Sequence, residues 1–106
     1  MTTYTDEEVA ANREKFLHAL ETTPESRHER WHILSYNGCG CAKGITAKSV
    51  LGVMASYRGL HRDLSKAIGV CPVWLHSMEY RDIGGGEEFT FAQHAAWIRE
   101  HGWGDE

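Results

Sequence analysis

The chain has 106 residues, of which 42% are hydrophobic and 25% are charged, a composition typical of one soluble globular domain. Its formal net charge of −4, with neutral histidines, argues against generic binding of duplex nucleic acid, which needs an excess of lysine and arginine. No apolar run approaches the roughly 20 residues that span a bilayer, so the sequence predicts no membrane interaction.

The amino-terminal residues and the cysteines bear on the cellular compartment. The first ten residues, MTTYTDEEVA, are polar and acidic and lack the basic start and apolar centre of a secretory signal. The chain has three cysteines, an odd number that cannot pair completely in internal disulfides. These features predict a cytoplasmic protein with reduced thiols.

The first predicted helix lies in the stretch YTDEEVAANREKFLHAL, residues 4–20. Thr5 and Glu8 have the spacing of a capping box, and the acidic residues after Thr5 suit the positive end of a helix dipole. Its apolar positions fall near one face: Val9, Phe16 and Leu20. Pro24 ends the helical run.

The next apolar segment, Trp31–Leu34, is ambiguous. It fits a short strand or an irregular segment that packs its aromatic side chain. A lone strand would lack a partner, so we favour the irregular segment.

Two further helices are predicted between Cys41 and Gly69. Apolar residues at i, i+3, i+4 and i+7 indicate the first: Ala47, Val50, Leu51 and Met54. Residues at i, i+4, i+7 and i+8 indicate the second: Leu60, Leu64, Ala67 and Ile68. Gly69 then stands where a left-handed carboxyl-terminal cap belongs.

The last third of the chain predicts a short helix, a loop and a closing helix. Pro72 suits the first position of the short helix, on which Trp74 and Met78 are four residues apart. The stretch RDIGGGEE, residues 81–88, is expected to be a loop, because three successive glycines cost much backbone entropy inside an element.

The closing helix is predicted to begin after Thr90, which has capping-box spacing to Gln93, and to end at Gly102. Its apolar face consists of three residues: Phe91, Ala95 and Ile98. The sequence therefore predicts an all-α fold, an irregular bundle of about five short helices that forms a single domain over residues 1–106.

The second half of the chain contains CGCAKGITAKSVLGV, LSKAIGV and WLHSMEYRDIGGGEEFTFAQHAAWI, in that order. This order resembles small, functionally uncharacterised proteins of actinobacterial phages and prophages, which show a Cys-x-x-Gly helix start, a Leu-Gly step, an Asn-Asp-glycine loop and a Phe-x-x-x-Ala-x-x-Ile closing helix. The equivalent positions are Cys41, Gly44, Gly52, Ala67, Gly69, Asp82, Phe91 and Ile98. The chain departs from the pattern at Arg81, in place of asparagine, and at His94, in place of an isoleucine.

The resemblance implies a helical fold and a phage-type origin, and it implies no reaction. Small phage accessory proteins commonly occupy a component of the host cell. On this basis we expect a cytoplasmic protein that acts inside the host.

The cysteines are candidates for a zinc site or a reactive thiol. Cys39, Cys41 and Cys71 would bind zinc together with His61 or His76, but a one-residue gap between two cysteines suits tetrahedral zinc poorly. A helix start would acidify a catalytic thiol, but no local signature of a cysteine enzyme is present. The favoured interpretation is that Cys41 packs in the core, without bound metal or cofactor.

An anion site is a second candidate. Gly38 and Gly40 precede a helix whose first turns carry Lys43 and Lys48, and free amides, helix dipole and lysine together favour an anion. The spacing is not that of a Walker loop. The alternative is a glycine-permitted tight turn with surface lysines.

A basic pocket is a further candidate nearby. Arg58, His61 and Arg62 share a helical face by their spacing, and with Lys43 they would form a pocket for a small anion such as a signalling nucleotide. The favoured interpretation is a solvated face balanced by Asp63 and Glu79.

The remaining candidates are acidic and aromatic. Asp82, Glu87 and Glu88 would offer oxygen ligands to a cation, but they lack the alternating ligands of an EF-hand, so an acidic connection is the better interpretation. Trp103 and Trp74 are candidates for a partner surface, because exposed tryptophan is frequent in binding hot spots. Alternatively, Trp103 folds back and fixes the last helix.

No complete catalytic constellation is visible, so the sequence predicts a non-enzymatic binder and inhibitor of a host protein. The alternative is a protein that sequesters a small anionic ligand, and a distant third is a hydrolase that depends on cysteine or histidine. A homodimer is compatible with the sequence.

Overall fold

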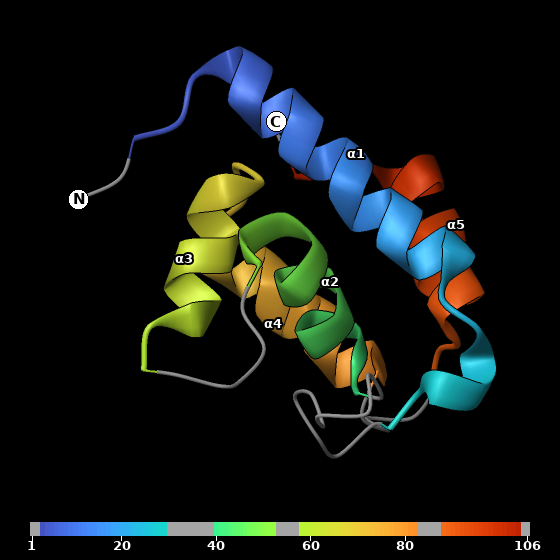
Figure 1. The fold of residues 1–106 in the computed structure, drawn as a ribbon. Coiled ribbons are helices and arrows are strands. Elements are labelled where there is room, and N and C mark those ends of the chain that lie inside the picture. Colours follow the sequence, from blue (N-terminus) through green and yellow to red (C-terminus); the bar gives the residue numbers. More distant parts are fainter. Residues whose placement is uncertain (1–2, 30–39, 53–57, 83–87, 105–106) are drawn as a thin grey trace.

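The computed structural model describes residues 3–29, 40–52, 58–82 and 88–104, and Figure 1 shows their arrangement. These ranges contain five α-helices: α1 (Asp6–Thr22), α2 (Ala42–Leu51), α3 (Leu60–Ala67), α4 (Pro72–Asp82) and α5 (Phe91–His101). A short 3-10 helix, η1 (Glu25–Arg27), follows α1, and no β-strand occurs in the described ranges. The predicted all-α fold is confirmed.

Both predicted capping boxes form. The Glu8 amide donates to the Thr5 hydroxyl at 3.1 Å, and the Thr5 amide donates to the Glu8 carboxylate at 3.0 Å. Thr90 and Gln93 make the same exchange at the start of α5. Each box pairs amides that the first turn of a helix leaves without partners.

The structure also confirms the helix boundaries predicted from Gly69, Pro72 and Gly102. Gly69 follows α3 with φ +64°, and the next amide, that of Val70, donates back to the Ser65 carbonyl at 3.0 Å. Pro72 is the first residue of α4, and Gly102 caps α5. Left-handed glycine caps of this kind satisfy carbonyls at the helix end.

The structure corrects the limits of two elements. The helix α2 ends at Leu51 because Gly52 is left-handed, so it stops short of the predicted Met54, which lies outside the described residues. Arg81 and Asp82 form the last turn of α4 instead of the predicted loop. The segment 31–34 lies outside the described residues.

The helices pack around one apolar core. The long helix α1 contacts chiefly α2 and α5, and α2 also contacts α3 and α4 (Figure 1). The Phe91 amide, at the start of α5, donates to the Glu25 carboxylate just after α1, and Trp103, just after α5, packs on Phe16 within α1. The two helices are therefore antiparallel. The largest buried apolar side chains are Phe16, Leu20, Leu64, Ile68, Leu75, Met78, Phe91 and Ile98. Among the described residues, no helix combines the length and apolar character that crossing a bilayer requires.

Candidate functional site

Two of the four residues predicted to form an anion pocket meet at a carboxylate. The Lys43 ammonium lies 3.1 Å from Glu79 Oε1, and His61 Nδ1 lies 3.2 Å from the same oxygen. These residues come from α2, α3 and α4, and all three side chains are mostly buried. Glu79 therefore supplies the charge that an anionic ligand would have brought.

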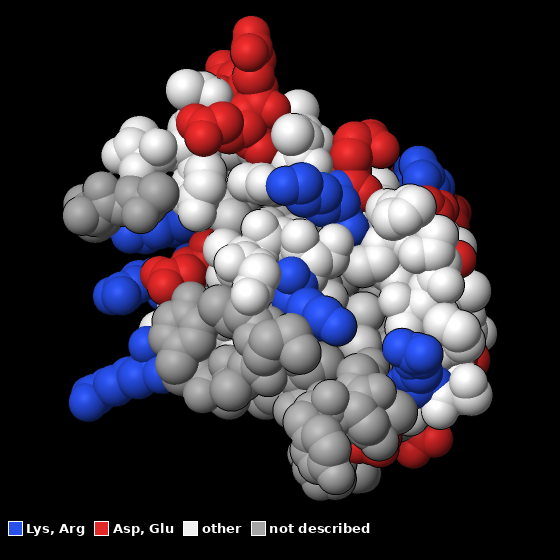
Figure 2. All heavy atoms as spheres, in the orientation of Figure 1, with Lys and Arg blue, Asp and Glu red and all other residues white. Residues whose placement is uncertain are grey.

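The other two predicted residues point elsewhere. Arg58 precedes the first turn of α3 and is exposed, and the Arg62 side chain is 69% exposed. Neighbouring residues on a helix differ in direction by about 100°, so Arg62 faces solvent while His61 faces α4. Figure 2 shows basic side chains projecting from the edge of the molecule where α3 lies. The four residues do not converge on one pocket.

A different hollow gathers basic side chains. It has a volume of about 280 Å³ and lies at the carboxyl-terminal ends of α1 and α2, with His18, Arg27 and Lys48 among its lining residues. The residues described as lining it include no carboxylate. Cations also suit the negative ends of two helix dipoles, so the basic character has a structural reason.

The two tryptophans predicted as partner contacts pack on each other. The rings of Trp74 and Trp103 are stacked at 5.3 Å, and Trp103 meets Phe16 edge-on at 5.4 Å. The guanidinium of Arg13 covers Trp103 at 5.0 Å and also donates to the Gly69 carbonyl. Both tryptophans are half-buried, so Trp103 folds back and fixes the end of α5 to α1.

The structure places Cys41 in the core, as predicted. Burial raises the pKa of the Cys41 thiol, so the predicted acidifying effect of the helix start does not prevail. Cys71 is exposed, and Cys39 lies outside the described residues. Within the described ranges no cysteine belongs to a group of three potential metal ligands.

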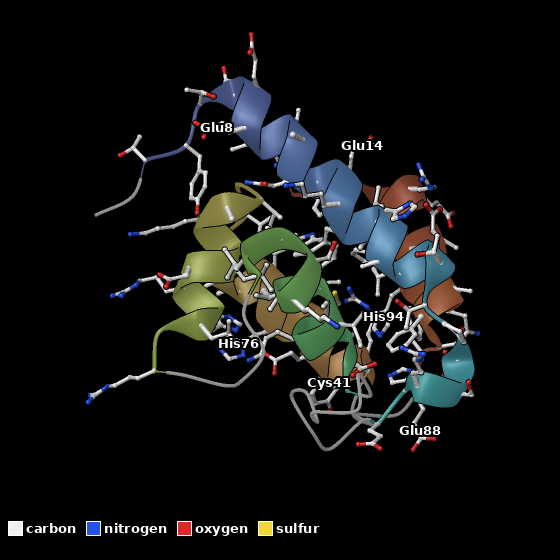
Figure 3. The ribbon with its side chains drawn as sticks, in the orientation of Figure 1. Glu8, Glu14, Cys41, His76, Glu88 and His94 are labelled. Carbon is white, nitrogen blue, oxygen red and sulfur yellow. The ribbon has the colours of Figure 1, made fainter. Side chains whose placement is uncertain are left out.

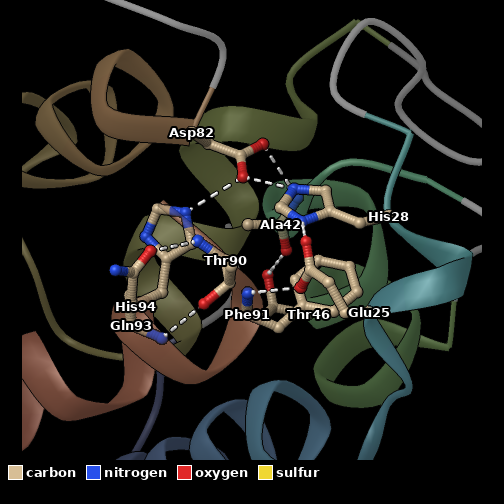
Figure 4. A network of polar contacts seen from close by, with 9 residues as sticks. All are labelled: Glu25, His28, Ala42, Thr46, Asp82, Thr90, Phe91, Gln93 and His94. Carbon is tan, nitrogen blue, oxygen red and sulfur yellow. Dashed lines mark hydrogen bonds and ion pairs between the residues drawn. The ribbon is translucent and has the colours of Figure 1, made fainter. Parts of the chain in front are cut away.

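The sequence did not single out the most buried polar cluster, a network centred on Asp82 (Figure 4). Asp82 Oδ1 accepts from His28 Nε2 at 2.6 Å and from His94 Nε2 at 3.0 Å. Asp82 Oδ2 accepts from the Ala42 amide at 3.1 Å, at the start of α2. His28 also contacts Glu25 Oε2 through Nδ1 at 2.7 Å. The network joins η1, α2, α4 and α5.

The protonation states follow from these contacts. Burial alone raises the pKa of Asp82, but hydrogen bonds from His28, His94 and the Ala42 amide lower it to about 2. Burial alone lowers the pKa of His28, but bonds to Asp82 and Glu25 outweigh burial and raise it. Both ring nitrogens of His28 face carboxylates, which fits a donating imidazolium.

His94 behaves in the opposite way. Burial lowers its pKa and outweighs the attraction of Asp82, so neutral His94 is favoured. Its Nε2 donates to Asp82, whereas its buried Nδ1 has no hydrogen-bond partner among the described residues. The ionised Asp82 carboxylate thus accepts hydrogen bonds from one imidazolium, His28, and one neutral imidazole, His94.

Enclosure decides what this network does chemically. The side chains of His28, Asp82 and His94 are each no more than 2% exposed, and the His28 ring stacks on Phe91 at 4.0 Å. The enclosed network forms a polar cross-link between helices. The Asp82 carboxylate is bonded to His28, His94 and the Ala42 amide, so the candidate cation set at 81–88 loses that ligand. Its third member, Glu87, lies outside the described residues.

The solvent side of α4 forms the main exposed surface with apolar character. Among the described residues, two large hydrophobic side chains are exposed to solvent: Val73 is 67% exposed and Tyr80 is 64% exposed. With His76 and Ser77 they occupy positions i, i+3, i+4 and i+7, which is one helix face. We call these four residues the α4 face.

No protein-family model, curated protein or solved structure matches the chain. The functional assignment therefore depends on the geometry of the described residues and on the sequence pattern.

Proposed function

We propose that this chain is a non-catalytic binding protein that docks onto a partner protein through the α4 face. The observation that carries the proposal is the exposure of Val73 and Tyr80 on one face of one helix. Burying these side chains against a partner would remove apolar surface from water, and tyrosine is frequent in binding hot spots. The half-buried tryptophans, in contrast, already have their contacts within the chain.

The charge beside the α4 face indicates the chemistry of the partner. The helix α3 packs against α4, and exposed basic side chains, Arg58 and Arg62, lie on its solvent side or just before it. A partner that offers an apolar cleft with an acidic border would match both features. The net negative charge of the whole chain does not oppose this match, because screening limits distant charges to a range of about 8–10 Å.

The host origin of the partner is part of the proposal and rests on the resemblance to small phage proteins. The non-catalytic character is supported by the enclosure of the reactive candidates: Cys41 is buried with a raised pKa, and the histidines around Asp82 are buried with it. Binding that blocks a host protein needs neither group.

A pair of variants tests the proposal. The double variant Val73→Glu/Tyr80→Glu should lose a host protein that the immobilised wild-type chain captures from an actinobacterial extract. Titration of that purified protein should show binding weakened by about tenfold or more. The matched control is Ala96→Glu, an exposed position on α5, which should bind like the wild type.

Retained binding by the double variant, or equal loss in the control, would contradict the proposal. Light scattering separates a further outcome: a wild-type dimer that the double variant converts to a monomer would make a second copy of the chain the occupant of the α4 face, and the host-protein proposal would fail.

The alternative function, sequestration of a small anion such as a signalling nucleotide, is favoured by the hollow that contains His18, Arg27 and Lys48. A nucleotide panel should then raise the melting temperature of the wild-type chain. The shift should vanish in Arg27→Glu/Lys48→Glu and persist in Arg58→Glu. A melting temperature that no nucleotide changes would exclude this alternative.

A further inference from the structure

The edge of the α4 face contains a group of side chains with the character of a metal site. His61 on α3 meets His76 and Glu79 on α4, and one potential ligand atom of each lies within 4.8 Å of the others. Figure 3 shows His76 beside α3, away from His94 on α5. We propose that His61, His76 and Glu79 bind a divalent transition metal, with zinc as the first candidate.

The protonation of His61 supports this assignment. Its Nε2 lies 2.9 Å from the Pro72 carbonyl oxygen, which can only accept, so Nε2 carries a hydrogen. In the neutral ring Nδ1 then carries a lone pair. A backbone carbonyl on the far nitrogen is the usual arrangement that orients a metal-bound histidine.

The other ring nitrogen of His61, Nδ1, is the atom that would bind a metal in such an arrangement. Nδ1 is buried and has no hydrogen-bond partner among the described residues, although Glu79 Oε1 lies 3.2 Å away. With Nε2 as the donating nitrogen, the Nδ1 lone pair faces the Glu79 carboxylate. A cation between them would give Nδ1 the partner that it lacks.

The distances between the donor atoms suit such a cation. With metal–ligand bonds of about 2.0–2.2 Å, the donors of a tetrahedral zinc site stand roughly 3.3 Å apart. The two nitrogen–oxygen distances are 3.2 Å from His61 and 3.8 Å from His76, whose side chain is 70% exposed and has room to turn. Two imidazoles and one carboxylate favour zinc, cobalt, nickel or copper over magnesium and calcium.

Lys43 competes with the metal. Its ammonium lies 3.1 Å from Glu79 Oε1, the same oxygen that faces both histidines. Without metal, Lys43 is the counter-ion of Glu79; a metal ion must displace it or bind against its charge. Removal of this charge should therefore tighten metal binding, whereas removal of a ligand should weaken it.

This inference shares His76 with the α4 face but does not rest on the proposed function, because metal binding between α3 and α4 needs no partner protein. Calorimetric titration of the full chain with zinc chloride should give one zinc ion per chain. His61→Ala and Glu79→Gln should each raise the dissociation constant about tenfold or more, and Lys43→Met should lower it. His101→Ala, which removes an exposed histidine on α5, is the control and should change nothing.

A second measurement covers the case in which a variant folds poorly. Zinc should raise the melting temperature of the wild type and of Lys43→Met, and it should leave that of Glu79→Gln unchanged. Cobalt chloride should give a visible spectrum of nitrogen and oxygen ligation without a sulfur charge-transfer band. Absence of zinc binding, binding that neither ligand variant weakens, or a sulfur band would overturn the assignment.

Discussion

The described residues include two clusters that each combine two histidines with a carboxylate, and the clusters differ in what surrounds them. In the network around Asp82, His28 and His94 are enclosed, and both oxygens of the carboxylate accept hydrogen bonds. In the cluster around Glu79, the His61 Nδ1 atom lacks a hydrogen-bond partner among the described residues, and His76 reaches solvent. Chemically similar side chains therefore form a structural cross-link in one cluster, whereas the other cluster keeps atoms that could bind a metal.

The largest loss of stability is expected when the buried charge of Asp82 is removed. Asp82→Asn leaves the His28 imidazolium without its main counter-charge, and loss of one partner of a buried pair costs about 3–5 kcal/mol. Urea unfolding at neutral pH measures this loss. Glu100→Gln, an exposed site on α5, should change the free energy of unfolding by less than about 0.5 kcal/mol. A similar small change for Asp82→Asn would mean that the network does not hold the helices together.

The contribution of the Asp82 network to stability should also decrease at acidic pH. The pKa of Asp82 is lowered from 3.8 to about 2, so its contribution to stability is present above pH 3.8 and is lost as the pH falls toward 2. The shift corresponds to about 2 kcal/mol of the free energy of unfolding. The difference in the free energy of unfolding between the wild type and Asp82→Asn should shrink by about this amount over the interval. A difference that stays constant would contradict the ionised state of Asp82.

The two histidines of the buried network should titrate on opposite sides of their ordinary pKa of 6.5. His28 has a raised pKa, so its contribution to stability is complete below pH 6.5 and is lost as the pH rises through the folded-state value. His94 has a lowered pKa, so its contribution is present above pH 6.5 and is lost as the pH falls. Nuclear magnetic resonance of the imidazole protons resolves both, and the reverse order would refute the assigned protonation states.

The smallest effect on folding is expected at the Glu79 cluster. Without metal, Glu79→Gln removes the ion pair with Lys43. Because both side chains keep some contact with solvent, at 12% and 22% exposed, the loss should be about 1 kcal/mol, below the cost of breaking a fully buried pair. Urea unfolding in the presence of a chelator measures it, with Asp82→Asn as the reference. A loss as large as that of Asp82→Asn would remove the distinction between the two clusters.

Local patterns predicted much of the fold. The capping boxes at Thr5 and Thr90 and the glycine cap at Gly69 depend on residues close in sequence, and each formed where expected. The end of α4 was misplaced because the glycine-rich stretch suggested a loop from Arg81 onward. Asp82 continues the buried stripe of Leu75 and Met78, which places it in the helix.

The sites were harder to predict because they depend on contacts between distant segments. His94 carried one usable signal, since it lies at i+3 in the apolar stripe that begins at Phe91. His28 follows η1 and has no periodic signal, and its bond to Asp82 spans 54 residues. The position of Glu79 between Lys43 and His61 likewise arises only when three helices pack together.

The most direct test of the contrast is one set of urea unfolding curves, with and without zinc chloride, for the wild type, Glu79→Gln and His94→Leu. The account predicts that His94→Leu is less stable than the wild type without zinc by about 1–3 kcal/mol and keeps the stabilisation that zinc confers. Glu79→Gln should stay close to the wild type without zinc and gain nothing when zinc is added. Zinc stabilisation that persists in Glu79→Gln and disappears in His94→Leu would contradict the account.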